Sequence, residues 1–267
     1  MSLQSRLPTL ATLLLATSML AQPAPAQQGG IESVQPMASN ADPAFEVATI
    51  RPTDPSDQGQ GFHLNGHRVH IENIPVLNMI CFAYKLQNSQ VVNAPKWLDE
   101  ARWDVDGVPD QPGIPSNKQY QLMVQKLLAD RFHLQFHREQ RELPVYELTV
   151  LKSGSRLTPS KSAPDDGIDQ TGHIGRGQQY MRYTNNNMQD FVEGLEYIVS
   201  RPVVNDTGLT GRYDFLLRWS NEMQDSTPNS APGLFTAIQE QLGLKLVPTK
   251  APVDVLVIDH VAQPSAN

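Results

Sequence analysis

Two hydrophobic periods divide this chain into helical and extended segments. Apolar residues recur at i, i+3, i+4 and i+7 in four segments, which predicts amphipathic helices. These segments are residues 75–86, 116–132, 188–199 and 234–242. Elsewhere apolar and polar residues alternate with period two, which predicts strands with one buried face. The strand segments are 45–52, 62–74, 102–108, 133–139, 143–152, 178–185, 212–219, 245–248 and 253–261.

Local turn signals indicate how some of these segments connect. Asn65-Gly66 separates two short alternating runs, and this dipeptide is a strong signal for a β-hairpin. Residues 133–139 and 143–152 follow each other closely, so we expect them to pair as neighbouring strands. Residues 153–177 are rich in Gly, Ser, Pro and Asp, which is typical of a connection between two structural units.

One ordered set of short motifs occurs twice. In each half a helix is followed by Val-Val-Asn, an Arg-aromatic-Asp triplet, a second helix and Pro-Val, at similar spacing. The motif pairs are 91–93 and 203–205, 102–104 and 212–214, and 144–145 and 252–253. We interpret the chain as internally duplicated β-α-β-β-α-β-β units that form a pseudo-twofold pair around one shared core. Because the connections are short, we expect an α+β fold with mostly antiparallel sheets and helices packed on one face.

The N-terminal residues have the pattern of a secretory signal peptide. Arg6 is their only charge, an apolar run follows it, and Ala24-Pro25-Ala26 has the small residues of a cleavage site. The apolar run is shorter than a membrane-spanning helix requires, and a retained anchor is the alternative. We expect a signal peptide (1–26) cleaved near Ala26 and a chain that is secreted or periplasmic.

Composition divides the rest of the chain. The predicted parts are a flexible N-terminal tail (27–44), a first repeat half (45–152), a linker (153–177) and a second repeat half (178–267). We expect the two halves to form one domain.

Charge and cysteine content limit the possible partners. The net charge is −7 and there is no polybasic cluster, which argues against nucleic acid or an anionic membrane surface. No membrane span is expected after signal cleavage. The single cysteine, Cys81, excludes an intramolecular disulfide. It lies on the apolar face of a predicted helix, where we expect a small buried residue and no nucleophile.

Several of these motifs together resemble a known family. RPVVNDTGLTGRYDF (201–215) and EQLGLKL (240–246) are the most specific, and the resemblance extends over roughly residues 45–267. The chain is similar to the soil-associated proteins, a family of secreted proteins from soil bacteria that carry a domain of unknown function. VVNAPKWL (91–98) departs from the Gly-Gly-Pro-like turn usual in the family. In some relatives a similar domain follows a membrane metallopeptidase of the beta-lactam-sensor type, which implies a periplasmic sensing or binding role by analogy. No catalytic residues are established for the family, so none is carried over to this chain.

Asp206-Thr207-Gly208 has the residues of an aspartic-protease motif. Such enzymes need two carboxylates that share a proton. The first half has Ala94 at the matching position, so a dyad would require a homodimer that joins two copies of Asp206. Asn, Asp, Thr and Gly are also strong turn formers, and a turn capped by Asp206 is the interpretation we favour.

Three histidines offer an alternative as metal ligands. They are His63, His67 and His70, and His63 and His67 could face each other across the predicted hairpin. The chain lacks HExxH and any other zinc motif, so we favour surface or half-buried histidines.

The Arg-aromatic-Asp triplets have two possible roles. On a strand the Arg and Asp share a face and the aromatic residue takes the other. Arg102, Asp104, Arg212 and Asp214 would then form surface ion pairs beside a core aromatic residue, or else line a symmetric ligand groove between the halves. Because both halves keep the triplet, we favour the structural role.

The sequence therefore favours an exported non-enzymatic domain that binds an unknown protein or small molecule in the cell envelope. The alternative is a hydrolase, either a homodimeric aspartic-type protease through Asp206 or a histidine-dependent metal enzyme. No cofactor is expected, because the chain has no GxGxxG, P-loop, CxxC or GxSxG motif.

Overall fold

The computed structural model describes residues 35–163, 166–175, 178–220 and 231–264. The predicted signal peptide and its cleavage site near Ala26 lie outside these residues. Within the predicted flexible tail, residues 35–44 are attached to the first half. The backbone of Met37 donates to the carbonyl of Ile114, and the Met37 side chain is buried. One apolar side chain and a few backbone hydrogen bonds therefore order a segment whose composition suggested mobility.

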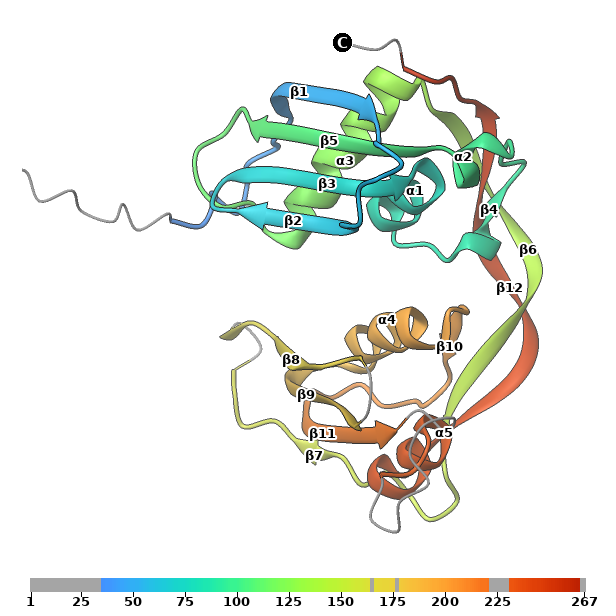
Figure 1. The fold of residues 1–267 in the computed structure, drawn as a ribbon. Helices are drawn as coiled ribbons and strands as arrows, with labels where there is room; N and C mark the ends of the chain where they lie inside the picture. Colours follow the sequence, from blue (N-terminus) through green and yellow to red (C-terminus); the bar gives the residue numbers. More distant parts are fainter. Residues whose placement is uncertain (1–34, 164–165, 176–177, 221–230, 265–267) are drawn as a thin grey trace, which may run out of the picture. The chain divides into compact units, whose positions relative to one another are not determined.

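The first half contains a four-stranded antiparallel sheet in the order β1-β5-β3-β2 (Figure 1). Its strands are β1 (Phe45–Pro52), β2 (Gly61–Asn65), β3 (Arg68–Pro75) and β5 (Arg102–Pro109). β2 and β3 form the predicted hairpin, in which Asn65 lies opposite Arg68. The helices α1 (Val76–Tyr84) and α3 (Asn117–Phe132) cover one face of the sheet.

The first core lies between this sheet and its two helices. Alternate strand residues such as Ile71 and Val105 pack against Ile80 of α1 and Leu127 of α3. The helix α3 begins after Ser116, which forms a capping box with Gln119. The short elements η1 (Asn88–Gln90) and α2 (Trp97–Glu100) connect α1 to β5. The period-two pattern thus leaves one sheet face for the core and the other for polar side chains.

The second half has a sheet of the same kind, in the order β7-β11-β9-β8 and with antiparallel neighbours. Its strands are β7 (Thr158–Pro159), β8 (Asp169–His173), β9 (Gln178–Asn186) and β11 (Tyr213–Ser220). Against its inner face pack α4 (Met188–Val199), α5 (Leu234–Ala237) and the π-helix η3 (Ile238–Leu242). β7 and β8 lie within the predicted linker 153–177, so much of that segment belongs to this sheet.

Two long strands connect the halves. β6 (Gln135–Val150) and β12 (Leu244–His260) pair with each other in antiparallel orientation over most of their length (Figure 1). The prediction that 133–139 and 143–152 pair with each other is wrong, because 135–139 and 143–150 both belong to β6. Pro144 and Pro252 lie in the middle of this pair. A two-stranded ribbon tolerates proline because each strand has an open edge there.

Each end of the ribbon takes up a third, short strand in parallel orientation. β4 (Val91–Val92) pairs with β12 at Leu256 and Val257, and β10 (Val203–Asn205) pairs with β6. Both Val-Val-Asn motifs therefore have the same kind of neighbour. The sheet order is β10-β6-β12-β4, and these two parallel pairs stand beside otherwise antiparallel sheets.

The α+β class and the helices on one sheet face are confirmed. The expected single core is not what the structure shows, because the buried apolar side chains form two clusters, one in each half. Each cluster includes residues from both ribbon strands, such as Leu256 in the first and Leu148 in the second. The duplication itself stays a prediction. Among the described residues, no helix has both the length and the hydrophobicity of a membrane span.

Candidate functional site

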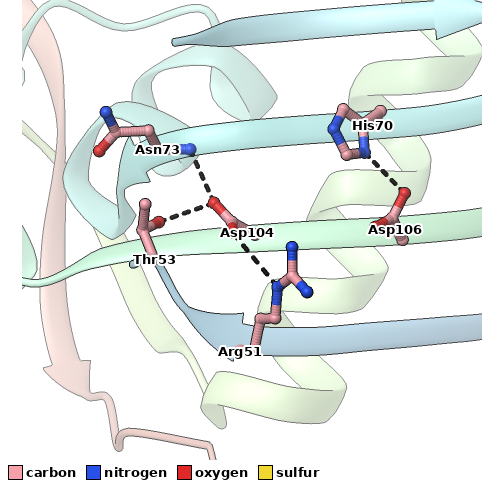
Figure 2. A network of polar contacts seen from close by, with 6 residues as sticks. All are labelled: Arg51, Thr53, His70, Asn73, Asp104 and Asp106. Carbon is pink, nitrogen blue, oxygen red and sulfur yellow. Dashed lines mark hydrogen bonds and ion pairs between the residues drawn. The ribbon is translucent and has the colours of Figure 1, made fainter. Parts of the chain in front are cut away.

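Asp104 on β5 is the most buried carboxylate among the sites that the sequence indicated. Its side chain is only 3% exposed. It accepts hydrogen bonds from the Thr53 hydroxyl (2.7 Å), the Asn73 backbone N–H (3.0 Å) and Nε of Arg51 (3.3 Å), as Figure 2 shows. Burial alone would raise the pKa of Asp104. The hydrogen bonds from Asn73, Thr53 and Arg51, together with the Arg51 charge, outweigh it and lower this pKa below its usual value.

This network holds a bend in β3. Asn73 has a left-handed backbone with a φ of 54°, at the point where the register of β3 against β5 shifts. Asp104 accepts a hydrogen bond from the N–H of Asn73, and Arg102 donates to the carbonyl oxygen of Asn73 at 3.0 Å. The Asn73 side chain in turn donates to the Gly59 carbonyl. The first triplet therefore fixes the strand just before α1 begins.

The second triplet makes the corresponding contacts. Asp214 accepts from the N–H of Asn185 at 2.8 Å, and Arg212 donates to the Asn185 carbonyl at 2.8 Å. Asn185 also has a left-handed φ, of 57°. In neither triplet does the Arg bond to its own Asp among the described contacts; the cation beside Asp104 is Arg51. The Arg and Asp of each triplet therefore do not form the predicted ion pair. Instead, both form hydrogen bonds to the backbone of the same asparagine.

Two of the three candidate histidines, His63 and His70, lie on the outer face of the first sheet. His63 and His70 are directly opposite on β2 and β3, with ring centroids 6.4 Å apart. Nδ1 of His70 is 2.6 Å from Asp106 (Figure 2), and Nε2 of His63 is 3.8 Å from Glu72. His67 lies in the turn, so it does not face His63 as expected. In the described part of the chain, no three His, Cys, Asp or Glu side chains are placed to hold a metal ion.

Asp206 lies on an exposed turn directly after β10. The cap of this turn is Asn205, whose Oδ1 accepts from the N–H and the hydroxyl of Thr207 at 3.2 and 2.8 Å. Gly208 completes the turn with a φ of 66°, which favours glycine. The side chain of Asp206 lines neither of the hollows described below. The expected turn is present, but Asn205 caps it in place of Asp206.

Cys81 is half-buried on α1. Burial raises the pKa of its thiol to about 12, and its Sγ–H donates to Oδ1 of Asn88 at 3.2 Å. A thiol with this pKa remains protonated near neutral pH, so it is a poor nucleophile.

A hollow of about 570 Å³ lies at one end of the first sheet. Asp54, Asp57 and Glu100 give it an acidic side, and Arg102 lines it as well. The Arg102 guanidinium donates a hydrogen bond to the carbonyl of Asn73, so it already has a structural role at the bend in β3.

A second hollow, of about 650 Å³, lies in the second half. We call it the aromatic hollow. Its main lining residues are Gln179, Tyr197, Ile198, Trp219, Leu234 and Phe235. They come from the first residues of β9, the last turn of α4, the end of β11 and the start of α5. None of the ten described residues that line it is charged. The arrangement suits the binding of an uncharged, partly apolar group.

Sequence reasoning missed this site. The helical pattern of α4 placed Phe191 and Leu195 in the core and left Tyr197 on the polar side, where an aromatic residue is unusual. In β9, Gln179 falls on the same face as Met181 and Tyr183, which point into the core. A polar residue on an apolar strand face and an aromatic residue on a polar helix face were the available signals.

The structure defines an α+β protein with two cores joined by a two-stranded ribbon. A family profile described as a protein of unknown function (DUF3738) matches residues 77–261, and the chain belongs to this family. The match begins in α1 and ends just after β12, so it includes the second core and the part of the first half that follows β3. No curated protein and no solved structure matches the chain.

Proposed function

We propose that this chain is an exported, non-enzymatic domain that binds a partner protein in the cell envelope through the aromatic hollow. The observation that carries this proposal is the group of exposed apolar side chains around the hollow. Tyr197 is 77% exposed, Ile174 44% and Phe235 38%. Exposed aromatic residues that surround a concave surface are typical of protein interfaces, where they supply the central contacts.

Export and the resemblance to the soil-associated proteins are part of the same proposal. The apolar run after Arg6 and the small residues at Ala24-Pro25-Ala26 support secretion. The resemblance to soil-associated proteins supports an envelope-sensing role, in which binding rather than turnover is the activity. Neither Asp206 nor the histidine pair lies in the aromatic hollow, so the hydrolase alternative has no support from this site.

The experiment is capture of partners from the envelope fraction and the medium by wild-type and variant chains. Tyr197→Ser removes the most exposed aromatic side chain of the hollow. Tyr180→Ser is the matched control, because Tyr180 is 46% exposed but does not line the hollow. We expect Tyr197→Ser to lose a protein that wild type and Tyr180→Ser both retain. Equal retention by all three chains, or measurable turnover of a peptide or ester library, would contradict the proposal.

A further inference from the structure

Two buried polar side chains lie side by side in the aromatic hollow. Gln179 on β9 and Trp219 on β11 are direct cross-strand partners, and both line the hollow. Gln179 is 4% exposed and Trp219 is 2% exposed. Both lie at the end of the sheet, where α4 and α5 supply the apolar walls. Ser200 and Ser220 line the hollow as well, so it presents polar and apolar surface side by side.

Neither of these two side chains has a hydrogen-bond partner among the described residues. Their neighbour Ser220 does, because its hydroxyl donates to the carbonyl of Ala231. The Gln179 amide offers two donors and one acceptor, and the Trp219 indole offers one donor. Neither side chain is among the described residues whose polar atoms are fully buried without a partner, so these groups are open to the hollow and can bond to an occupant. An occupant with a carbonyl oxygen and an N–H would satisfy them.

The lining also constrains the charge of the occupant. None of the described residues that line the hollow is charged, so a carboxylate or an ammonium group would find no opposing charge among them. Ile198, Leu234 and Phe235 present apolar surface to the rest of the occupant. A volume of about 650 Å³ is enough for one large side chain and its adjoining amide groups.

We infer that the aromatic hollow binds an extended peptide segment of a partner protein, with one apolar side chain against Phe235 and Leu234. A neutral backbone amide of that segment bonds to Gln179 and Trp219. This inference rests on the proposed function and adds the chemistry that the partner presents. A peptide fits better than a free small molecule, because the exposed surface of Tyr197 and Ile174 continues the contact area outside the hollow.

The experiment follows the indole N–H signals of the isotope-labelled full chain by NMR. The chain has three tryptophans, and Trp219→Phe assigns the signal that belongs to the hollow. Trp97 and Trp103 do not line the hollow and serve as internal controls for the fold. The probes are acetyl-Ala-Phe-Ala-amide, acetyl-Ala-Glu-Ala-amide and toluene, which is apolar but has no amide.

We expect acetyl-Ala-Phe-Ala-amide to shift the Trp219 signal in a saturable way and to leave Trp97 and Trp103 in place. Gln179→Leu should weaken this binding at least about tenfold, because the peptide loses a side chain that can donate to its carbonyl oxygen and accept from its N–H. Gln178→Leu, an exposed neighbour on the same strand, should bind as wild type does. The glutamate peptide should bind at least about tenfold more weakly than the phenylalanine peptide.

Two results would overturn the inference. One is the absence of any shift at Trp219; the other is equal binding by toluene together with no effect of Gln179→Leu. If partner capture still depends on Tyr197 in either case, the proposed function stands and only the peptide chemistry is wrong. If capture does not depend on Tyr197, the proposed function itself fails.

Discussion

The Asp104 carboxylate accepts a 3.0 Å hydrogen bond from the backbone N–H of Asn73, a residue with a left-handed φ of 54°. Asp214 holds Asn185 in the same way in the second half, at 2.8 Å. In both halves this contact lies just before the first helix of the half. The Arg-aromatic-Asp triplet is therefore a device that stabilises a bend between strand and helix.

Asp104→Asn should destabilise the chain by about 2 kcal/mol at neutral pH, because a buried charged acceptor of three hydrogen bonds is lost. The folded-state pKa of Asp104 lies below its usual value, so its contribution is present above the ordinary carboxyl pKa of about 4 and is lost as pH falls below it. Urea unfolding of both chains at pH 7 and at pH 3 measures this difference.

Asp106→Asn is the control for this prediction. Asp106 lies two residues further along β5 and pairs with His70 on the partly exposed outer face. Its replacement should cost less than about 1 kcal/mol. If the two variants lose the same stability, the network around Asp104 has no special role.

Glu196→Gln should stabilise the chain slightly at neutral pH, by about 0.5 kcal/mol. Burial and the charge of Glu193 raise the pKa of Glu196, although the hydrogen bond from the N–H of Val203 opposes them. A raised pKa means that the charged form is disfavoured in the folded state, so its cost appears as pH rises above about 4.5. Glutamine keeps the acceptor for Val203 and removes the charge. The gain should be present at pH 7.5 and absent at pH 3.5; a gain that does not depend on pH would contradict this account.

Asn205→Ala should cost about 1 kcal/mol, because the side chain that caps the turn through Thr207 is lost. Asp206→Ala should change the stability by no more than about 0.5 kcal/mol, since Asp206 is exposed on that turn. Chemical denaturation of the two variants side by side tests the assignment. A larger effect at Asp206, or a peptidase activity that Asp206→Ala abolishes, would restore the protease alternative.

The elements that the sequence predicted well depend on neighbours in the chain. The helices follow from the spacing of their apolar residues, and the β2–β3 hairpin follows from Asn65-Gly66. The failures concern partners that are far apart in sequence. Leu148 of β6 lies opposite Leu246 of β12, a pairing that no local pattern specifies. The period-two pattern identifies a strand but does not identify its neighbour.

The aromatic hollow could not be predicted because four separate elements build it. The alternation in β9 placed Gln179 on the inner face, but only the structure shows Trp219 opposite it and Phe235 beside it. The sequence shows the Arg-aromatic-Asp triplet in both halves. It does not show the partners of the triplets, Asn73 and Asn185, because a left-handed backbone at asparagine leaves a weak signal in a single sequence.

Photo-crosslinking in the cell envelope tests the central claim most directly. A photoreactive phenylalanine analogue replaces Tyr197 at the hollow or Tyr180, which is exposed but lies outside it. We expect a discrete crosslinked partner protein from position 197 and none from position 180. Crosslinks of equal yield from both positions, or none from position 197 under conditions where the partner is captured, would contradict binding through the aromatic hollow.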